Sequence, residues 1–481
     1  MDGPDRERRT AGFRARTPVE TARETLREAV GVSADGEPVT GRERIALTDG
    51  DDRVLAETVT AERSVPHYER AAMDGYAVQA SDTHGASGHS PAILAIDSTT
   101  PIDAPTADND DAAGPPAGPD EAPSTNGEGD AESGSNRATR VEPGAAVRVH
   151  TGSALPDGAD AVVMIEDVTE LPDVGELEVD DAVAVGENVA PVGEDVEAGT
   201  TLYEPGHRLR PSDLGLLRSA GIEQVTVARR PSVAVLPTGE ELVTPDEEPA
   251  PGQVVETNGL TVASLVERWG GLDDYRAPVT DDESRLRAAI EGALDHDVVV
   301  TTGGSSVGER DLLPEVVADL GEVLVHGVAL KPGHPVCLGI IEETPVLALP
   351  GYPVACLVNA VQFLRPTLSW LVGEPVSDHP TVAATLDRKI PSEPGTKTFA
   401  RVTVEPATTG EHATEDAERG DSAPAYRAVP TRASGSGVLS SVALADGWVI
   451  VDEPREGIPA GERVAVEFWE GVRAGRQQGG D

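Results

Sequence analysis

Cysteine, aromatic residues, positive charge and long apolar runs are all scarce in this sequence. The two cysteines, Cys337 and Cys356, are too few for a disulfide framework, and neither belongs to a CxxC pair that would indicate a zinc site. Because both stand in apolar runs, we expect them to be small buried hydrophobic residues. The longest apolar stretch, residues 336–350, is broken by Glu342 and Glu343, and the N-terminus lacks the apolar core of a signal peptide. We therefore expect a soluble, cytoplasmic protein.

Negative charge dominates the sequence, because 38 Lys and Arg residues stand against 85 Asp and Glu residues, which gives a formal net charge of −47. The imbalance argues against a nucleic-acid partner or an anionic membrane surface, since both attract basic patches. It is typical of a halophilic protein, because salt at 1 M screens the repulsion between surface carboxylates within about 3 Å. We assign this charge no role in catalysis.

The length of 481 residues predicts about three or four domains of roughly 100–200 residues each. Short strand-like runs on both sides of residues 97–140 predict one β-rich domain over 65–185, interrupted by a disordered insertion rich in Gly, Pro, Ser and Asp. Residues 378–470 carry strand-length runs and turn signals that predict a small β-barrel or a sandwich, interrupted by an acidic insertion at 406–424.

Residues 230–373 alternate β-branched runs with helical patterns. SVAVLPTG and DVVVTTGG predict strands, whereas TVASLVERWG, ESRLRAAIEGAL and LLPEVVADLG carry apolar residues at helical spacing. The alternation predicts an α/β domain with a mostly parallel sheet covered by helices on both faces.

The segment TTGGSSVGERD follows a buried strand and opens a helix, which is where open α/β sheets bind ligands. Gly303 and Gly304 lack a Cβ atom, which lets backbone N–H groups of the loop approach a phosphate, and Ser305 and Ser306 can donate further hydrogen bonds. Asp311 lies close enough in sequence to hold a magnesium ion against that phosphate. A plain strand-to-helix turn is the alternative. Without a Walker lysine or a GxGxxG pattern, an ordinary nucleoside triphosphatase or Rossmann enzyme is disfavoured.

Two Pro-Gly turns, LKPGHP and LPGYP, follow strand ends in the same domain and could place Lys331 and His334 on one rim of a pocket. Lys331 would supply a point charge for an oxyanion, and His334 a donor that strengthens when it is protonated. TGEEL ends the first strand and TDDE precedes a helix, so their carboxylates should share the sheet edge of the glycine-rich loop. The alternatives are a loop with a solvated lysine and, for Asp281 or Asp282, helix N-capping.

In the β-rich domain, MDGYA and HTGSALPDGADAVV combine turn glycines with Asp74 and Thr151. Taken alone, these segments are hairpin turns. Their occurrence together with the motifs of the α/β domain carries more information than either segment by itself.

Seven motifs, in order over roughly residues 18–470, together resemble the molybdopterin molybdenumtransferase family: AAMDGYAV, VRVHTGSALPDGADAVVMIED, VGEDVEAG, VAVLPTGEEL, VVVTTGGSSVGERD, VALKPGHP and LALPGYPVA. The resemblance implies a multidomain α/β plus β fold. Its parts would be an extended domain built from segments 18–64 and 186–229, the β-rich domain, an α/β molybdopterin-binding domain and a C-terminal β-barrel, between tails at 1–17 and 471–481. It also implies a homodimer whose active cleft lies between the α/β domain of one subunit and the β-rich domain of the other.

The resemblance implies roles for acidic and phosphate-binding residues. Ser306 and Asp311 would hold the pterin phosphate and its magnesium ion. Glu241 and Asp281 would support the ion or polarise the attacking water, and Asp195 would line the same cleft. The implied metal ligands are Glu241 and Asp311, and the implied catalytic residues are Asp74, Thr151, Glu241, Asp281, Asp311 and Lys331.

The resemblance also implies a molybdate site. Lys331 and His334 would face the oxyanion, with Arg401 and Ser436 contributing from the C-terminal domain. Arginine suits this task because a guanidinium fork matches an oxyanion better than an ammonium group does. The sequence departs from the family pattern at two points: the family more often has lysine where His334 stands, and LPGYP places Tyr352 where LPGNP is commoner.

The implied reaction joins molybdopterin-AMP and molybdate, with Mg²⁺ as a charge clamp on the pyrophosphate. Water cleaves the pyrophosphate bond, AMP leaves, and the dithiolene captures molybdenum to complete the molybdenum cofactor. A molybdopterin adenylyltransferase is expected as a partner. It is also an alternative identity, as is a non-catalytic pterin-binding scaffold. The motifs outside the α/β domain argue against the first alternative, and the acidic residues Glu241, Asp281 and Asp311 argue against the second.

Overall fold

The computed structural model describes residues 16–32, 36–97, 140–303, 312–407, 425–431 and 435–471. The chain divides into two compact units: a smaller one of residues 59–202 and 215–223, and a larger one of residues 1–58, 203–214 and 224–481. Most of the two predicted insertions lies outside the described ranges. Within those ranges, no helix is long and apolar enough to span a membrane.

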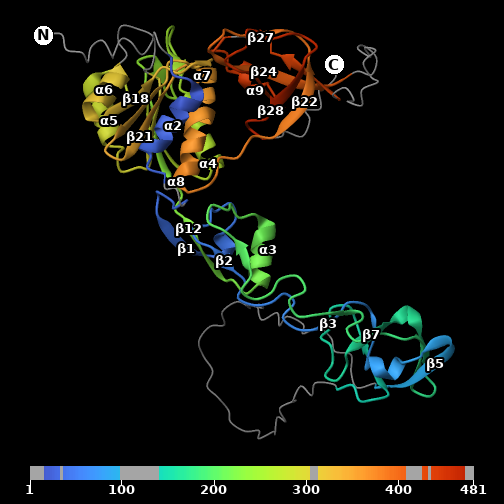
Figure 1. The fold of residues 1–481 in the computed structure, drawn as a ribbon. Coiled ribbons are helices and arrows are strands. Elements are labelled where there is room, and N and C mark those ends of the chain that lie inside the picture. Colours follow the sequence, from blue (N-terminus) through green and yellow to red (C-terminus); the bar gives the residue numbers. More distant parts are fainter. Residues whose placement is uncertain are drawn as a thin grey trace, which may run out of the picture. The chain divides into compact units, whose positions relative to one another are not determined.

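A six-stranded sheet of the larger unit has the strand order β16-β13-β17-β21-β20-β18. Figure 1 labels two of these strands, β18 and β21. The four parallel strands are β16 (Leu272–Tyr275), β13 (Ser232–Pro237), β17 (Val298–Thr302) and β21 (Thr344–Leu349). Two antiparallel strands complete the sheet, β20 (Cys337–Ile341) and β18 (Glu322–His326). The predicted mostly parallel sheet is confirmed, whereas β20 is not among the predicted strands.

Helices cover both faces of this sheet. Along β13, Val233 and Val235 belong to one buried apolar cluster and Ala234 and Leu236 to another, because successive side chains of a strand point to opposite faces. The first cluster includes side chains of α4 (Asn258–Arg268), α7 (Pro353–Asn359), a π-helical turn η4 (Ala360–Leu364) and α8 (Arg365–Leu371). The second includes side chains of α5 (Glu283–Glu291) and α6 (Leu312–Leu320). The prediction of a sheet covered on both faces is confirmed.

The two cysteines lie inside the α/β domain. Both are buried and free, as expected from their apolar surroundings. Cys356 belongs to the first apolar cluster and Cys337 to the second. Burial raises the pKa of the Cys356 thiol, so this residue stays a neutral packing side chain.

Helix α2 (Val19–Ala29) packs on the α/β domain, although the resemblance assigns residues 18–64 to the extended domain. Its fully buried Val19, Ala22 and Leu26 join the apolar cluster of α4 and α7. The spacing of three and four residues between these side chains gives the helix an apolar stripe, and the α/β core buries that stripe.

The C-terminal region is a closed barrel in which β24 pairs with both β25 and β26, and β22 and β28 complete the ring. Its strands are β22 (Thr381–Leu386), β24 (Lys397–Pro406), β25 (Tyr426–Pro430), β26 (Gly447–Val451) and β28 (Arg463–Glu467). The barrel prediction is confirmed and the sandwich alternative is wrong. A further strand, β19 (Leu330–Lys331), comes from the α/β domain and pairs in parallel with the start of β24. This pairing places the LKPGHP segment against the barrel.

The smaller unit contains a second six-stranded sheet, in the order β7-β4-β6-β5-β9-β8. Its strands are β4 (Gly75–Val78), β5 (Ser87–Ile96), β6 (Ala145–Val149), β7 (Ala161–Met164), β8 (Val168–Leu171) and β9 (Glu176–Asp181). Because β5 and β6 pair in parallel, the segments on either side of the predicted insertion at 97–140 belong to one sheet.

Shorter elements complete the described fold. The two segments assigned to the extended domain meet where β1 pairs with β12 in antiparallel fashion. These shorter elements are β1 (Arg42–Ala46), η1 (Leu47–Asp49), β2 (Val59–Thr60), β3 (Arg70–Ala71), η2 (Ala80–Thr83), η3 (Ile165–Asp167), β10 (Val189–Ala190), β11 (Thr201–Tyr203), α3 (Pro211–Ser219), β12 (Gln224–Ala228), β14 (Leu242–Val243), β15 (Val254–Val255), β23 (Ile390–Pro391), α9 (Ser440–Ala443) and β27 (Gly457–Ile458).

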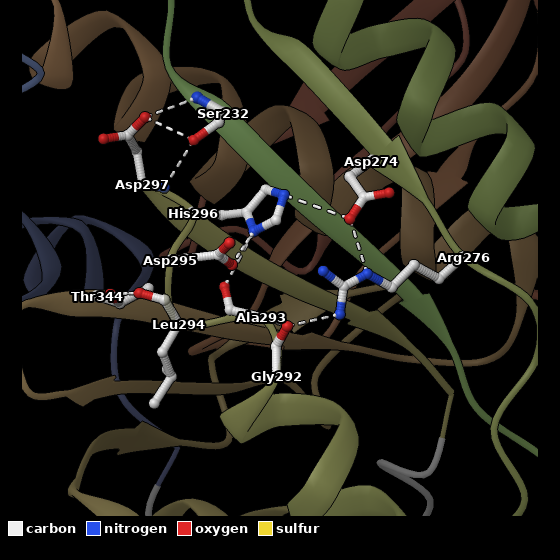
Figure 2. A network of polar contacts seen from close by, with 10 residues as sticks. All are labelled: Ser232, Asp274, Arg276, Gly292, Ala293, Leu294, Asp295, His296, Asp297 and Thr344. Atoms are coloured by element: carbon white, nitrogen blue, oxygen red, sulfur yellow. Dashed lines mark hydrogen bonds and ion pairs between the residues drawn. The ribbon is translucent and has the colours of Figure 1, made fainter.

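A polar network fixes the loop between α5 and β17 to the neighbouring strands (Figure 2). The Asp297 carboxylate accepts hydrogen bonds from the backbone N–H and the hydroxyl of Ser232, each at 2.8 Å. His296 Nε2 lies 3.3 Å from a carboxylate oxygen of Asp274, and Arg276 donates to the same oxygen at 2.7 Å. Since Ser232 begins β13 and Asp297 directly precedes β17, the contacts between these two residues secure the amino ends of β13 and β17.

Candidate active site

A cavity of about 1230 Å³ in the larger unit is lined by residues that follow β13, β17 and β21 and by residues of the barrel. Its position agrees with the rule that open α/β sheets bind ligands at the carboxyl ends of their strands. Seven of the residues predicted from the sequence line it: Glu241, Asp281, Gly303, Lys331, His334, Arg401 and Ser436.

Carboxylates line the side of the cavity that the sheet forms. Glu241 follows β13 and its carboxylate lies over Gly239, where a Cβ atom would be only 2.8 Å from Oε2. Asp282 is the N-cap of α5, because its carboxylate accepts a hydrogen bond from the Arg285 N–H at 3.1 Å. The capping alternative therefore applies to Asp282, and the neighbouring Asp281 lines the cavity.

Substitution of each of these adjacent aspartates can distinguish a catalytic role from a helix-capping role. Asp282→Ala removes the N-cap, so it should lower the melting temperature by roughly 2 °C and leave turnover unchanged. The resemblance implies that Asp281 supports the metal ion or polarises the attacking water, so Asp281→Ala should lower kcat for AMP release by roughly 100-fold and leave the cap intact. Thermal unfolding and steady-state rates measure the two effects. An equal loss of turnover in both variants would contradict this division of roles.

Gly303 ends β17 and begins the glycine-rich loop. Its φ is +139°, and a Cβ atom there would overlap the carbonyl oxygen of Thr238, so the backbone requires glycine. The Gly303 N–H donates to the Leu349 carbonyl at 3.0 Å and ties the loop to β21. The other residues predicted for this loop lie outside the described ranges: Gly304, Ser305, Ser306 and Asp311.

Lys331 and His334 flank a turn that a buried side chain of the α/β domain fixes through a hydrogen bond. The buried Asn359 of α7 donates through Nδ2 to the Gly333 carbonyl at 2.9 Å, and Gly333 has φ +116° with no room for a Cβ atom. Lys331 Nζ donates to Glu393 of the barrel at 3.1 Å. More than half of each side chain is exposed, so the pair is weak and an oxyanion can compete for Lys331.

His334 lies in surroundings that disfavour its protonation. It is half-buried, and burial, followed by the positive charge of Arg16, lowers the pKa of His334 below its usual range. Burial therefore favours the neutral imidazole, and the protonated form, which would be the stronger donor, needs a lower pH than for an exposed histidine. A neutral imidazole can still donate one N–H to an anion.

Cations line the side of the cavity next to the barrel. Arg401 of β24 is only 7% exposed, and burial lowers the pKa of its guanidinium group. Ser436 accepts a hydrogen bond at its carbonyl from the Val354 N–H at 3.0 Å, which ties its loop to the start of α7. Arg388 and Lys389, which belong to none of the sequence motifs, also line the cavity just before β23. Two adjacent cations in so acidic a chain are the signal that could have revealed them.

The smaller unit holds the other three predicted residues. Asp74 and Thr151 lie together, because the Asp74 carboxylate accepts hydrogen bonds from the Thr151 N–H at 2.6 Å and its hydroxyl at 2.7 Å. The backbone hydrogen bond, then the hydroxyl, holds the pKa of Asp74 below its usual range. Asp195 belongs to the same unit, and its N–H donates to the Val65 carbonyl at 3.0 Å. None of the three belongs to the unit that contains the cavity.

Three family models match successive regions of the chain. They are the MoeA N-terminal region (domain I and II) over residues 17–221, the "Probable molybdopterin binding domain" over 234–370, and the MoeA C-terminal region (domain IV) over 383–469. A molybdopterin biosynthesis protein of Methanocaldococcus jannaschii is 33% identical over 431 residues, which cover 88% of this chain and 91% of that protein. The chain belongs to the molybdopterin molybdenumtransferase, or MoeA, family.

Other MoeA proteins match most of the chain. The molybdopterin molybdenumtransferase of Bacillus subtilis is 31% identical over 364 residues, which cover 75% of this chain and 76% of the relative. Two crystal structures of a molybdopterin biosynthesis MoeA protein from Pyrococcus horikoshii each have a TM-score of 0.72, with 32% and 28% identity. They cover 95% and 94% of this chain and all of the crystallised chain. The MoeA regions on both sides of the molybdopterin-binding domain disfavour the adenylyltransferase alternative.

Proposed function

We propose that this member of the MoeA family inserts molybdate into adenylylated molybdopterin, releases AMP and so completes the molybdenum cofactor. The arrangement of charge in the cavity carries the proposal. Glu241 and Asp281 line the side formed by the sheet, whereas Lys331 and Arg401 line the side next to the barrel. A phosphoanhydride with its metal ion suits the acidic side, and a tetrahedral oxyanion suits the cationic side.

Magnesium is part of this proposal. Glu241 and Asp281 offer carboxylate oxygens, the ligands that Mg²⁺ prefers, so the donor chemistry fits. Among the described residues no group of three His, Cys, Asp or Glu side chains could hold a metal ion, so we assign the ion to Glu241 together with Asp311 of the glycine-rich loop. When bound, Mg²⁺ would neutralise the charge of the pyrophosphate oxygens. The Asp281 carboxylate is then the group that orients water and accepts its proton.

The cationic side would hold the molybdate. The Arg401 guanidinium presents a planar fork to two oxygens, and the Lys331 ammonium adds a point charge once it leaves Glu393. The neutral His334 would donate one N–H and the Ser436 hydroxyl one O–H. Arg401, His334 and Ser436 line the cavity before the substrate binds, an arrangement that lowers the reorganisation cost, whereas Lys331 must first leave Glu393.

We extend the proposal to the assembly and the setting. Asp74, Thr151 and Asp195 would complete the active cleft from the smaller unit of a second copy, which makes the working form a homodimer. The chain has 85 acidic and 38 basic residues, and this excess of acidic residues suits a cytoplasm with concentrated salt. Activity should therefore need molar salt. A molybdopterin adenylyltransferase would supply the adenylylated substrate.

The purified chain, in molar potassium chloride with molybdopterin-AMP and Mg²⁺, should release AMP at a rate that molybdate increases. Liquid chromatography of the nucleotide measures this release, and the omission of molybdate is the control. An adenylyltransferase would instead consume ATP and molybdopterin, and a scaffold would bind the pterin without turnover. The transferase proposal fails if molybdate leaves the rate of AMP release unchanged.

A further inference from the structure

Tyr352 is an exposed aromatic side chain at the wall of the cavity. It lines the cavity with 64% of its surface exposed, whereas Phe399, the other aromatic residue that lines it in the described part of the chain, is 1% exposed. An aromatic ring usually gains stability by burying its apolar faces. An exposed ring at a cavity wall therefore suggests that a ligand in the cavity packs against one of those faces. The alternative is a surface tyrosine without a ligand. The contacts around Tyr352 help to decide between the two.

The backbone around Tyr352 is held from three directions. Asn258 Nδ2 donates to the Gly351 carbonyl at 2.7 Å, and the Val354 N–H donates to the Ser436 carbonyl at 3.0 Å. The ring itself lies against Gly437, where an added Cβ atom would be 3.3 Å from ring atom Cδ1. The α/β domain and the barrel region thus fix the position of a ring that stays largely exposed. Such preorganisation lowers the entropy cost of binding a ligand on that ring.

Tyr352 also stands next to the predicted phosphate loop. A Cβ atom on Gly351 would lie 3.4 Å from the Cα atom of Gly303, so the residue before Tyr352 packs directly on the start of that loop. Gly303 and Tyr352 both line the cavity, so the end of β17 and the ring face the same space. The Tyr352 hydroxyl has no hydrogen bond to any described residue, so the ring is the part of the side chain that a ligand would use.

We propose that Tyr352 is a binding residue whose ring stacks on a planar nitrogen heterocycle of the phosphate-bearing substrate. Adenylylated molybdopterin has two such heterocycles, the pterin and the adenine, and both present a π face of the same kind. The inference rests on the proposed function for the identity of the substrate. Stacking on an aromatic side chain tolerates either ring, because it needs only a flat face.

Two substitutions of Tyr352 separate stacking from general packing. Tyr352→Leu keeps an apolar side chain without the flat ring, and should weaken binding of the stacked ligand by about tenfold. Tyr352→Phe keeps the ring and should stay within about twofold of the wild type, since the hydroxyl has no hydrogen bond to the described residues. Tyr426→Leu is the matched control, because Tyr426 is 41% exposed on β25 and does not line the cavity.

Isothermal titration calorimetry with AMP alone and with molybdopterin alone provides two arms. A loss confined to AMP in Tyr352→Leu supports stacking on adenine, and a loss confined to molybdopterin supports stacking on the pterin. Unchanged affinity for both ligands, or an equal loss in Tyr352→Phe, overturns the inference. The wild type's molybdate-stimulated AMP release is measured in parallel. Its absence would overturn the proposed function, whereas the binding arms would still decide the role of Tyr352.

Discussion

Gly303→Ala is expected to reduce turnover by more than about 100-fold and to destabilise the α/β domain. The Cβ atom of alanine would overlap the Thr238 carbonyl oxygen, and φ at this position is +139°. A non-glycine residue in such a conformation costs about 1–3 kcal/mol, and an overpacked contact costs about the same again. Thr238 directly follows β13, the strand that pairs with β17. To remove the overlap with its backbone oxygen, the end of one of these strands must move relative to the end of the other. A displacement of about 1 Å at a catalytic loop is enough to cost 100-fold in rate.

A matched control separates the backbone strain from the collision. Gly395 has φ +80° in the barrel region, and a Cβ atom there would meet nothing within 4 Å. Gly395→Ala should therefore show only the conformational cost, about 1–2 kcal/mol, with turnover unchanged. Urea unfolding and steady-state rates of AMP release measure both variants. If Gly303→Ala behaves like Gly395→Ala in both measurements, close packing at the loop start has no part in catalysis.

The α/β domain could be predicted from its sequence because its signals are local. The β-branched runs of β13 and β17 and the helical spacing in α4, α5 and α6 each lie within a few residues of chain. Strand β20 was missed because its turn to β21, at Glu342 and Glu343, lacks the usual glycine or asparagine. Glu342 occupies the left-handed region there with φ +55°, a conformation that the sequence gives no reason to expect for glutamate.

The candidate site could be predicted only in part, because some of its residues depend on long-range contacts. Lys331 and His334 follow from the Pro-Gly turn between them, whereas Arg401 came only from the resemblance. The pairing of β19 with β24 brings Arg401 into the same cavity, and no local pattern encodes that pairing. Asn359 was missed entirely: it stands in an apolar helical run, and its partner Gly333 lies 26 residues earlier.

Arg401→Met is expected to lower the molybdate-stimulated rate of AMP release by roughly 100- to 1000-fold. This is the usual effect of removing one preorganised donor from a site that stabilises negative charge. Arg401 is 7% exposed, and although burial lowers the pKa of its guanidinium group, an arginine remains charged at neutral pH. Methionine fills a similar volume, so packing in the barrel is largely kept. Arg401→Lys should recover only part of the rate, because an ammonium group lacks the planar fork.

The dependence of the rate on molybdate concentration distinguishes an oxyanion site from a general loss of activity. With saturating molybdopterin-AMP, Arg401→Met should raise the molybdate concentration needed for half-maximal rate, while release of AMP without molybdate stays at the wild-type level. Arg427→Met is the matched control: Arg427 lies on the adjacent strand β25, pairs with Asp387 at 3.0 Å and does not line the cavity. That variant should keep the wild-type response to molybdate. If Arg401→Met also keeps the wild-type response to molybdate, Arg401 does not bind the oxyanion. Lys331 and His334 would then be the groups that bind it.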